Sequence, residues 1–262
     1  AAETLDLYQD EGFGSEDTYD IPSVRTRLYR TKMPARHGTM RGTSFVQTCF
    51  AVESHTDAVA DALGIDPVDF RKKNLALDSF APLLDACAEK IGYGGAPEAR
   101  HRGIGFAICH HGGRQLGAAA AEVSVDPSTG VVRVERLAGA FDIGLVVNLN
   151  TLTANTRGAM IWGLGFALFE EVRLDGHSCH THSLGDYRMP RFSDVPPIDI
   201  AFFSNEIRNG GFSIVHCGST SVDLQFYPRI ADSLVDGVQI PVEQFSRSGE
   251  AVSRSHDDRE PM

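Results

Sequence analysis

The first third of the chain carries apolar residues at the spacing of helices. Across residues 45–63, apolar and small residues recur every three to four positions, and a glycine directly follows the run. Asp66 precedes Pro67, an order typical of an N-cap and a first helical turn, so a short helix is expected there. A third helix is expected at about 80–91, before a glycine-rich linker at 92–97.

After the linker, apolar and polar residues alternate with a period of two, which is typical of half-buried strands. The expected strands, including one that precedes the first helix, cover residues 24–33, 103–109, 121–126, 131–142 and 198–204. The segment DPSTG predicts a hairpin turn in which Gly130 takes a positive φ. A helix is expected at residues 152–169, with Gly158, Gly163 and Gly165 packed closely against other backbone.

These patterns predict an α+β fold, in which a helical piece is followed by a mixed sheet with a packed glycine-rich helix. The change of period at the linker predicts a first domain over residues 1–95 and a second over 96–245. Residues 246–262 are polar and are expected to form a disordered tail.

Composition excludes several classes of partner. The formal net charge is −11, so nucleic acid and anionic membrane surfaces are not the expected partners. No apolar run approaches the length needed for membrane insertion. The five cysteines are scattered, and none are spaced C-x-x-C, which predicts neither a disulfide framework nor a zinc ribbon. A reducing, cytoplasmic location is expected, or a periplasmic one if a leader has been removed.

Three groups of residues could carry chemistry. Arg41 and Gly42, with two hydroxyls just before a helix, could bind an anion through free backbone N–H groups, or form an ordinary turn. Asp142, Gly144 and Asn148 directly follow a strand, where they could form a functional loop or only an Asx turn. The third group is rich in histidine and cysteine and comprises Cys109, His110, His111, His177, Cys179, His180, His182, His216 and Cys217.

A zinc or copper site is one interpretation of the third group, and a solvated hairpin tip is the other. No second pair of ligands has the usual C-x-x-C or H-x-x-x-H spacing, so no specific zinc site is expected. Cys49 lies on an apolar helical stripe, which predicts a buried and unreactive thiol.

Several longer segments occur in an order found in one known family. The segment MRGTSFVQ is followed by Glu53, Asp57 and a DP..FR..N tract that ends at Asn74. Next come AAEVSVDPSTGVVRVERLAGAFDIGLVVN, RGAMIWGLGFALFEEVRLDG and LGDYRMPRFSDVPPIDIAF. Residues 19–211 thus resemble the C-terminal part of the molybdopterin-binding subunit of the xanthine dehydrogenase and aldehyde oxidase family, the molybdenum hydroxylases. EKIGYG followed by RGIGFA is most similar to the isoquinoline 1-oxidoreductase β-subunit-like branch.

This resemblance implies oxidative hydroxylation of an aldehyde or an N-heterocycle at a molybdenum centre held by a pterin cofactor, expected in its cytosine dinucleotide form. The family's arginine-glycine loop matches Arg41 and Gly42, and the cofactor-binding residues it implies are Arg41, Gly42, Thr43, Ser44 and Gln47. An aromatic residue usually follows the glycine of that loop, and a second glycine comes next. Thr43 and Ser44 occupy those two positions in this chain.

The chain departs from the family in two further ways. The family's catalytic base is a glutamate in a GG.GE.G segment, but the corresponding stretch, NGGFSIVHCGSTSVDLQFYPRIADSL, has none, and the expected position falls near Thr220. The upstream half of the family subunit, with its glycine-rich cofactor loop, is not found in this sequence. Resemblance also weakens abruptly after Gly211.

Three hypotheses follow from these matches and departures. The first is a fragment or split subunit that needs an upstream-half chain and an iron–sulfur subunit, with iron–sulfur clusters and flavin or haem on partner chains. The second is a decayed or repurposed homologue that serves as a non-catalytic assembly or interaction module. The third is a metal-binding protein that uses the histidine- and cysteine-rich group. The first predicts that this chain alone binds molybdopterin weakly or not at all, because half of the cradle is missing.

Overall fold

The computed structural model describes residues 18–23, 45–95, 100–111, 115–175 and 178–203. The expected strand at 24–33 and the expected disordered tail at 246–262 lie outside these residues.

The three expected helices of the first part are confirmed. They are α1 (Phe45–Ala62), α2 (Pro67–Lys73) and α3 (Ala81–Ile91), with a single 3-10 turn, η1 (Asp78–Phe80), before α3. Asp66 caps α2 as expected, because its side chain accepts hydrogen bonds from the backbone N–H groups of Val68 at 2.8 Å and Asp69 at 3.1 Å. Gly92 ends α3 in the left-handed conformation, with φ of 74°.

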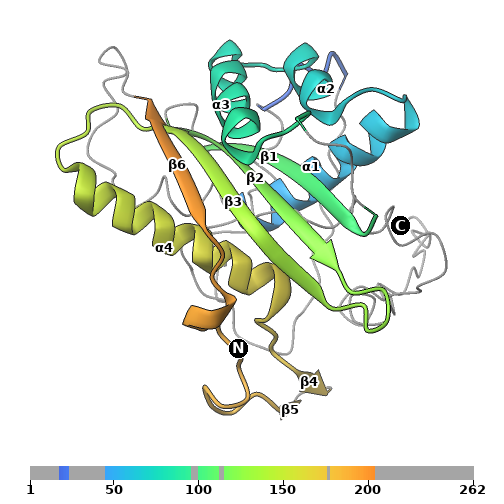
Figure 1. Ribbon diagram of the computed structural model, residues 1–262, viewed down its shortest axis with the longest axis vertical. Helices are drawn as coiled ribbons and strands as arrows, with labels where there is room; N and C mark the ends of the chain where they lie inside the picture. Colours follow the sequence, from blue (N-terminus) through green and yellow to red (C-terminus); the bar gives the residue numbers. More distant parts are fainter. Residues whose placement is uncertain (1–17, 24–44, 96–99, 112–114, 176–177, 204–262) are drawn as a thin grey trace, which may run out of the picture.

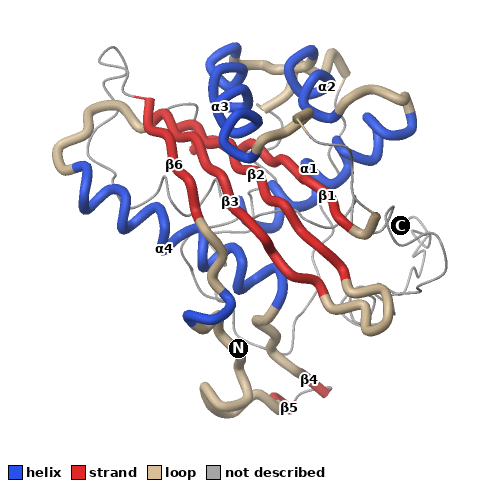
Figure 2. Tube along the Cα trace, in the orientation of Figure 1, coloured by secondary structure: helices blue, strands red, loops and turns tan. Residues whose placement is uncertain are grey.

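The second part is a mixed four-stranded sheet with the order β1-β2-β3-β6, as Figures 1 and 2 show. Its strands are β1 (Arg102–His111), β2 (Gln115–Val125), β3 (Val132–Asp142) and β6 (Ile198–Phe203). The first three are antiparallel neighbours. Strand β6 pairs with β3 in parallel, because the chain crosses over through α4 (Leu149–Leu168) between them. Smaller elements follow α4, namely β4 (Leu174–Asp175), β5 (Ser178–Cys179) and η2 (Phe192–Asp194).

Each face of the sheet packs against a different helix, because successive strand residues point to opposite faces. On one face, Phe141 of β3 packs with Met160 and Leu164 of α4. On the other face, Leu84 and Cys87 of α3 pack against a layer of alanines from β2 and β3, namely Ala118, Ala120, Ala138 and Ala140. The helices of the first part therefore share a core with the sheet.

The glycine-rich helix differs in detail from the expectation. It begins at Leu149 rather than at residue 152, because the Asn148 side chain accepts a hydrogen bond from the Thr151 backbone N–H at 3.0 Å and caps an earlier turn. Close packing was wrong for Gly158, which has open space where a side chain would lie. At Gly165 an added Cβ would meet the Pro190 ring at 3.0 Å and the Glu170 carboxylate. None of the described helices is long and apolar enough to cross a membrane.

Candidate functional site

The outer edge of β1 is covered by side chains from the two helices that precede it. An edge strand leaves every second backbone N–H and C=O unpaired. The Ile108 N–H donates to Glu53 Oε2 at 3.0 Å, and the Ile108 carbonyl accepts from Cys49 Sγ at 3.5 Å. The Phe106 carbonyl accepts from Arg71 Nη2 at 2.9 Å. Side chains of α1 and α2 thus stand where a further strand would otherwise pair.

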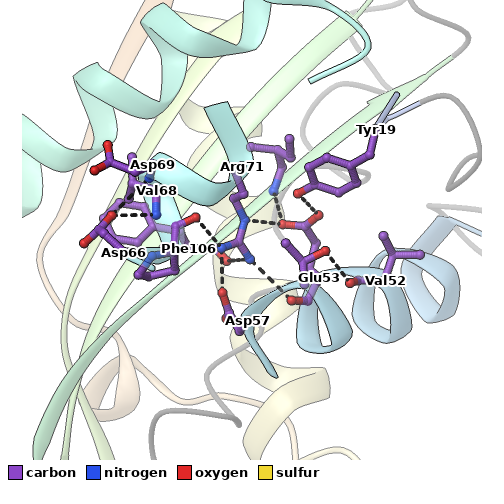
Figure 3. A network of polar contacts seen from close by, with 12 residues as sticks. Tyr19, Val52, Glu53, Asp57, Asp66, Val68, Asp69, Arg71 and Phe106 are labelled. Carbon is purple, nitrogen blue, oxygen red and sulfur yellow. Dashed lines mark hydrogen bonds and ion pairs between the residues drawn. The ribbon is translucent and has the colours of Figure 1, made fainter. Parts of the chain in front are cut away.

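Arg71 is at the centre of the polar contacts that cover the edge of β1 (Figure 3). None of its side chain is exposed. Its Nε donates to Glu53 Oε2 at 2.9 Å, and its Nη1 donates to Asp57 Oδ1 at 2.5 Å. Further donations reach the carbonyls of Pro67 at 3.1 Å and Glu53 at 3.3 Å. One cation therefore joins α1, α2 and β1, and its two carboxylate partners compensate the cost of burying it.

Glu53 receives a further donor from the start of the described chain. The Tyr19 hydroxyl donates to Glu53 Oε1 at 2.6 Å, while the Tyr19 backbone bridges to Leu75. Burial raises the pKa of Glu53 and the Arg71 guanidinium opposes this rise. Burial and the Glu53 carboxylate raise the pKa of Tyr19 well above its usual value. Since all the groups that contact the Glu53 carboxylate donate to it, the arrangement holds an ionised Glu53 and a neutral Tyr19.

These contacts set the direction of α1. Cys49 lies against Ile108 of β1, whereas Asp57, two turns further along the helix, meets the arginine that bonds to Phe106. Helix α1 therefore runs antiparallel to β1, and its first turn lies toward the end of β1 that carries His110 and His111. The arginine-glycine loop immediately precedes that first turn in the sequence.

The residues expected to bind the cofactor lie almost wholly outside the described part of the chain. Arg41, Gly42, Thr43 and Ser44 are outside it, as is Thr220 near the expected catalytic position. Gln47 lies in the first turn of α1, and its side chain is outside the description. Their roles stay predictions.

The same end of the sheet brings together residues from all four strands. His110, Leu116, Asp142 and Phe203 are register partners across β1, β2, β3 and β6, so they share the face that α3 covers. The His110 ring lies 6.2 Å from the ring of Phe80, just before α3. Asp142 is 4% exposed, and among the described residues its Oδ1 is a buried oxygen without a hydrogen-bond partner.

Two residues of the loop after Asp142 have a structural role, whereas none is found within the described residues for the Oδ1 atom of Asp142 itself. Gly144 takes a left-handed conformation, with φ of 76°, and lets the chain turn away from the strand. Asn148 is the N-cap of α4, so it acts within the fold. The Oδ1 atom of Asp142 has no corresponding structural contact among the described residues.

The histidine- and cysteine-rich residues do not form one cluster in the described ranges. Cys179, His180 and His182 are all exposed, and His180 Nε2 lies 4.0 Å from Asp175 Oδ2. Cys109 is buried in β1. Within the part of the chain that the structure describes, no group of three or more His, Cys, Asp or Glu residues is arranged to hold a metal ion. His177, His216 and Cys217 lie outside it.

Sequence patterns alone missed the network around Arg71. Glu53 and Asp57 lie one turn apart and within a stretch of α1 that is otherwise rich in apolar and small residues. Two acids on one face of such a helix are a signal for a buried cation partner. Tyr19 offered no such signal, because it belongs to none of the helices or strands expected from the sequence.

Two family models match the chain, each described as a molybdopterin cofactor-binding domain. One covers residues 8–75 and the other covers residues 111–196.

Curated relatives carry names from redox enzymology. The chain is 30% identical over 212 residues to the membrane-bound aldehyde dehydrogenase [pyrroloquinoline-quinone] of Gluconacetobacter polyoxogenes, covering 72% of this chain and 27% of that protein. A nicotinate dehydrogenase subunit from Pseudomonas putida is 30% identical over 199 residues, covering 70% and 17%. The beta subunit of isoquinoline 1-oxidoreductase from Brevundimonas diminuta is 29% identical over 195 residues, covering 71% and 24%. The chain thus spans about a quarter or less of these relatives.

Solved structures share the fold. Quinoline 2-oxidoreductase from Pseudomonas putida 86 superposes with a TM-score of 0.68 at 14% identity, covering 79% of this chain and 52% of that one. Aldehyde oxidoreductase from Desulfovibrio gigas superposes with a TM-score of 0.59 at 15% identity, covering 71% and 38%.

Proposed function

Because the chain belongs to the xanthine dehydrogenase and aldehyde oxidase family of molybdenum hydroxylases, we propose that it forms part of the molybdopterin cradle of an enzyme that hydroxylates an aldehyde or an N-heterocycle. The substrate class follows from the relatives' names, which include aldehyde, nicotinate, isoquinoline and quinoline oxidoreductases. Upstream family segments and iron–sulfur and flavin or haem centres are proposed to complete the enzyme, from elsewhere in the polypeptide or from partner chains.

The observation that carries this proposal is the way in which the two matched regions join. Glu53 and Arg71 belong to the match at residues 8–75, and they bond to Ile108 and Phe106 of β1. Strand β1 then pairs along its length with β2, which belongs to the match at residues 111–196. A buried ionic contact thereby holds both cofactor-binding regions in one fixed arrangement. Such an arrangement is what a cofactor contacted from both regions requires.

The residues at this end of the fold suit the proposed group. Molybdopterin presents a phosphate and a pterin ring with N–H donors, so it requires anion-binding groups and hydrogen-bond acceptors. The start of the helix that follows Arg41 and Gly42 in the sequence is rich in free N–H groups, which can bind an anion. The unpartnered Oδ1 of Asp142 is a hydrogen-bond acceptor that suits an N–H of the pterin ring. We propose Arg41, Gly42, Thr43, Ser44 and Gln47 as cofactor-binding residues. When bound, the molybdenum centre supplies the oxidising equivalents for hydroxylation.

This chain's own residues bind and orient in this proposal, and they do not supply the catalytic base. Residues 209–234 contain no glutamate, and Thr220 stands near the expected position. A hydroxyl does not act as a base at neutral pH, and base assistance contributes roughly a hundredfold to ten-thousandfold in rate. This departure also favours a second candidate, a non-catalytic assembly module that keeps the family fold.

One experiment tests the proposal and separates the two candidates. The native complex is purified from the source organism through a tag on this chain, and molybdenum and pterin are measured per chain. Turnover is then measured with a panel of aldehydes and N-heterocycles and an artificial electron acceptor. Stoichiometric cofactor with turnover supports the hydroxylase, whereas cofactor without turnover supports the assembly module.

Variants of the loop provide the matched comparison. Replacing Arg41 by methionine is expected to lower cofactor content, because an anion-binding cation is lost. Arg157, on the exposed side of α4, is the control for loss of a positive charge. A complex without molybdenum and pterin would refute the proposal.

A further inference from the structure

Asp142 is a buried residue with one carboxylate oxygen that no described residue satisfies. It is the last residue of β3 and is 4% exposed, and its Oδ1 has no hydrogen-bond partner among the described residues. Its register neighbour on β2 is Leu116, which is fully buried, and its neighbour on β6 is Phe203. A buried carboxylate oxygen without a donor destabilises a fold, so its presence requires an explanation.

The other buried charged groups show what structural use looks like. Glu53, Asp57 and Arg71 are each within 6% of complete burial, and each has charged or backbone partners. Asn148 in the following loop caps α4. Asp142 differs from all of them, because no N–H or O–H of the described chain satisfies its free oxygen. The missing donor therefore has to come from another molecule or another segment.

The position of Asp142 indicates which molecule supplies the missing hydrogen-bond donor. Strands β1, β3 and β6 end and β2 begins at the same end of the sheet, so Asp142 lies at the end where the chain leaves three of the strands. The first turn of α1, which follows the arginine-glycine loop, lies toward this end. The carboxylate is therefore at the end of the domain where both matched cofactor-binding regions approach each other.

We propose that Asp142 is a ligand-binding residue whose Oδ1 accepts an N–H from the amino-pyrimidinone edge of the pterin cofactor, an inference that rests on the proposed function. That edge carries an amino group and a ring N–H side by side, and a carboxylate is the side chain that accepts from such a pair. The bond satisfies the orphaned oxygen only in the loaded protein. Asp142 thus contributes to binding at a cost to the stability of the cofactor-free fold.

Because Asp142 favours cofactor binding at a cost to stability, its replacement is expected to weaken binding without lowering the stability of the cofactor-free chain. Asp142→Asn and, separately, Asp142→Leu are introduced into the chain in its source organism, with Asp199→Asn on the exposed side of neighbouring β6 as the control. The native complexes are purified, and pterin released over time is quantified by fluorescence. Both Asp142 variants are expected to release pterin roughly tenfold faster than wild type, as for loss of a charged hydrogen bond, while the control does not.

Thermal unfolding of the cofactor-free chain is the second readout. Asp142→Leu is expected to melt at the same or a higher temperature than wild type, because an unsatisfied oxygen is removed. Unchanged pterin release in both Asp142 variants, with pterin present in wild type, would overturn this inference alone. A lower melting temperature in both variants would overturn it too, since Asp142 would then have a structural partner. Absence of pterin from the wild-type complex would refute the proposed function as well.

Discussion

Replacing Arg71 by methionine removes the cation that joins α1, α2 and β1. Methionine has a similar length, so the space stays filled, but Glu53 and Asp57 lose their partner. The Glu53 carboxylate is 1% exposed and keeps only the donors from Tyr19 and Ile108, while the Phe106 carbonyl loses its donor. The variant therefore leaves a buried, uncompensated charge and an unsatisfied carbonyl on the edge of the sheet.

The size of the effect follows from burial. Removing one partner of a buried ion pair costs about 3–5 kcal/mol of unfolding free energy. For a chain of this length, that corresponds to a fall in melting temperature of roughly 6–20 °C. The exposed pair between Arg102 and Glu122 provides the matched control, because Arg102 is 46% exposed and its contact at 3.2 Å is solvated. Arg102→Met is expected to cost at most about 1 kcal/mol.

Urea unfolding followed by circular dichroism measures both variants, with the slope of the transition reporting whether the same surface is exposed. A double variant, Glu53→Leu with Arg71→Met, is expected to regain part of the loss, because no charge remains buried at the Glu53 position. It should not reach wild type, since Ile108 N–H and the Phe106 carbonyl both lose their partners. A cost below about 1 kcal/mol for Arg71→Met at unchanged slope would refute the capping role.

Further predictions concern thiols, pH and catalysis. In a Cys217→Ser chain, the exposed thiol of Cys179 should react with a disulfide reagent at about pH 8. The thiol of Cys87, whose pKa is raised by burial to about 12, should react only when the chain unfolds. Fast reaction of more than one thiol in the folded chain would contradict this prediction. The backbone N–H of His182 donates to Asp186 and lowers the pKa of that carboxyl. The ionised Asp186 therefore stabilises its loop at pH values above its unfolded pKa, and this stabilisation is lost as the pH falls through the lowered folded pKa. A carboxyl NMR titration midpoint at or above 3.8 for Asp186 would disprove this prediction. If this chain is the non-catalytic module, the native complex should give little or no hydroxylation and Thr220→Glu should partly restore it, whereas robust turnover by the unmodified complex would support the hydroxylase and place the base elsewhere.

Local elements followed well from the sequence because their causes are local. The helix at Pro67 depends on Asp66 beside it, and the hairpin turn depends on Gly130, whose φ is 71°. The glycine-rich helix was expected to begin later than it does, because the capping role of Asn148 was not separated from an Asx turn. Close packing at Gly158 could not be decided from composition, since it depends on which side of α4 faces the sheet.

The candidate site divides in the same way. The order of motifs along the chain was sufficient to indicate the family, and the family models and curated relatives confirm it. Asp142 was singled out from its place after a strand, but only the structure revealed its burial and its unpartnered oxygen. Whether a polar side chain is satisfied depends on every neighbour in space, and a sequence pattern contains no such information.

The sequence by itself determined the main helices, most of the four sheet strands, apart from the first half of β2, and the family. Only the tertiary structure decided what the acids of α1 do. Glu53 and the backbone of Ile108 are 55 positions apart, and Glu53 and Arg71 are 18 apart. Their contact exists because β1 is the outer strand of the sheet and needs partners for its free edge. Strand order is a property of the whole fold, so the residues that satisfy an edge become identifiable only once the sheet has formed.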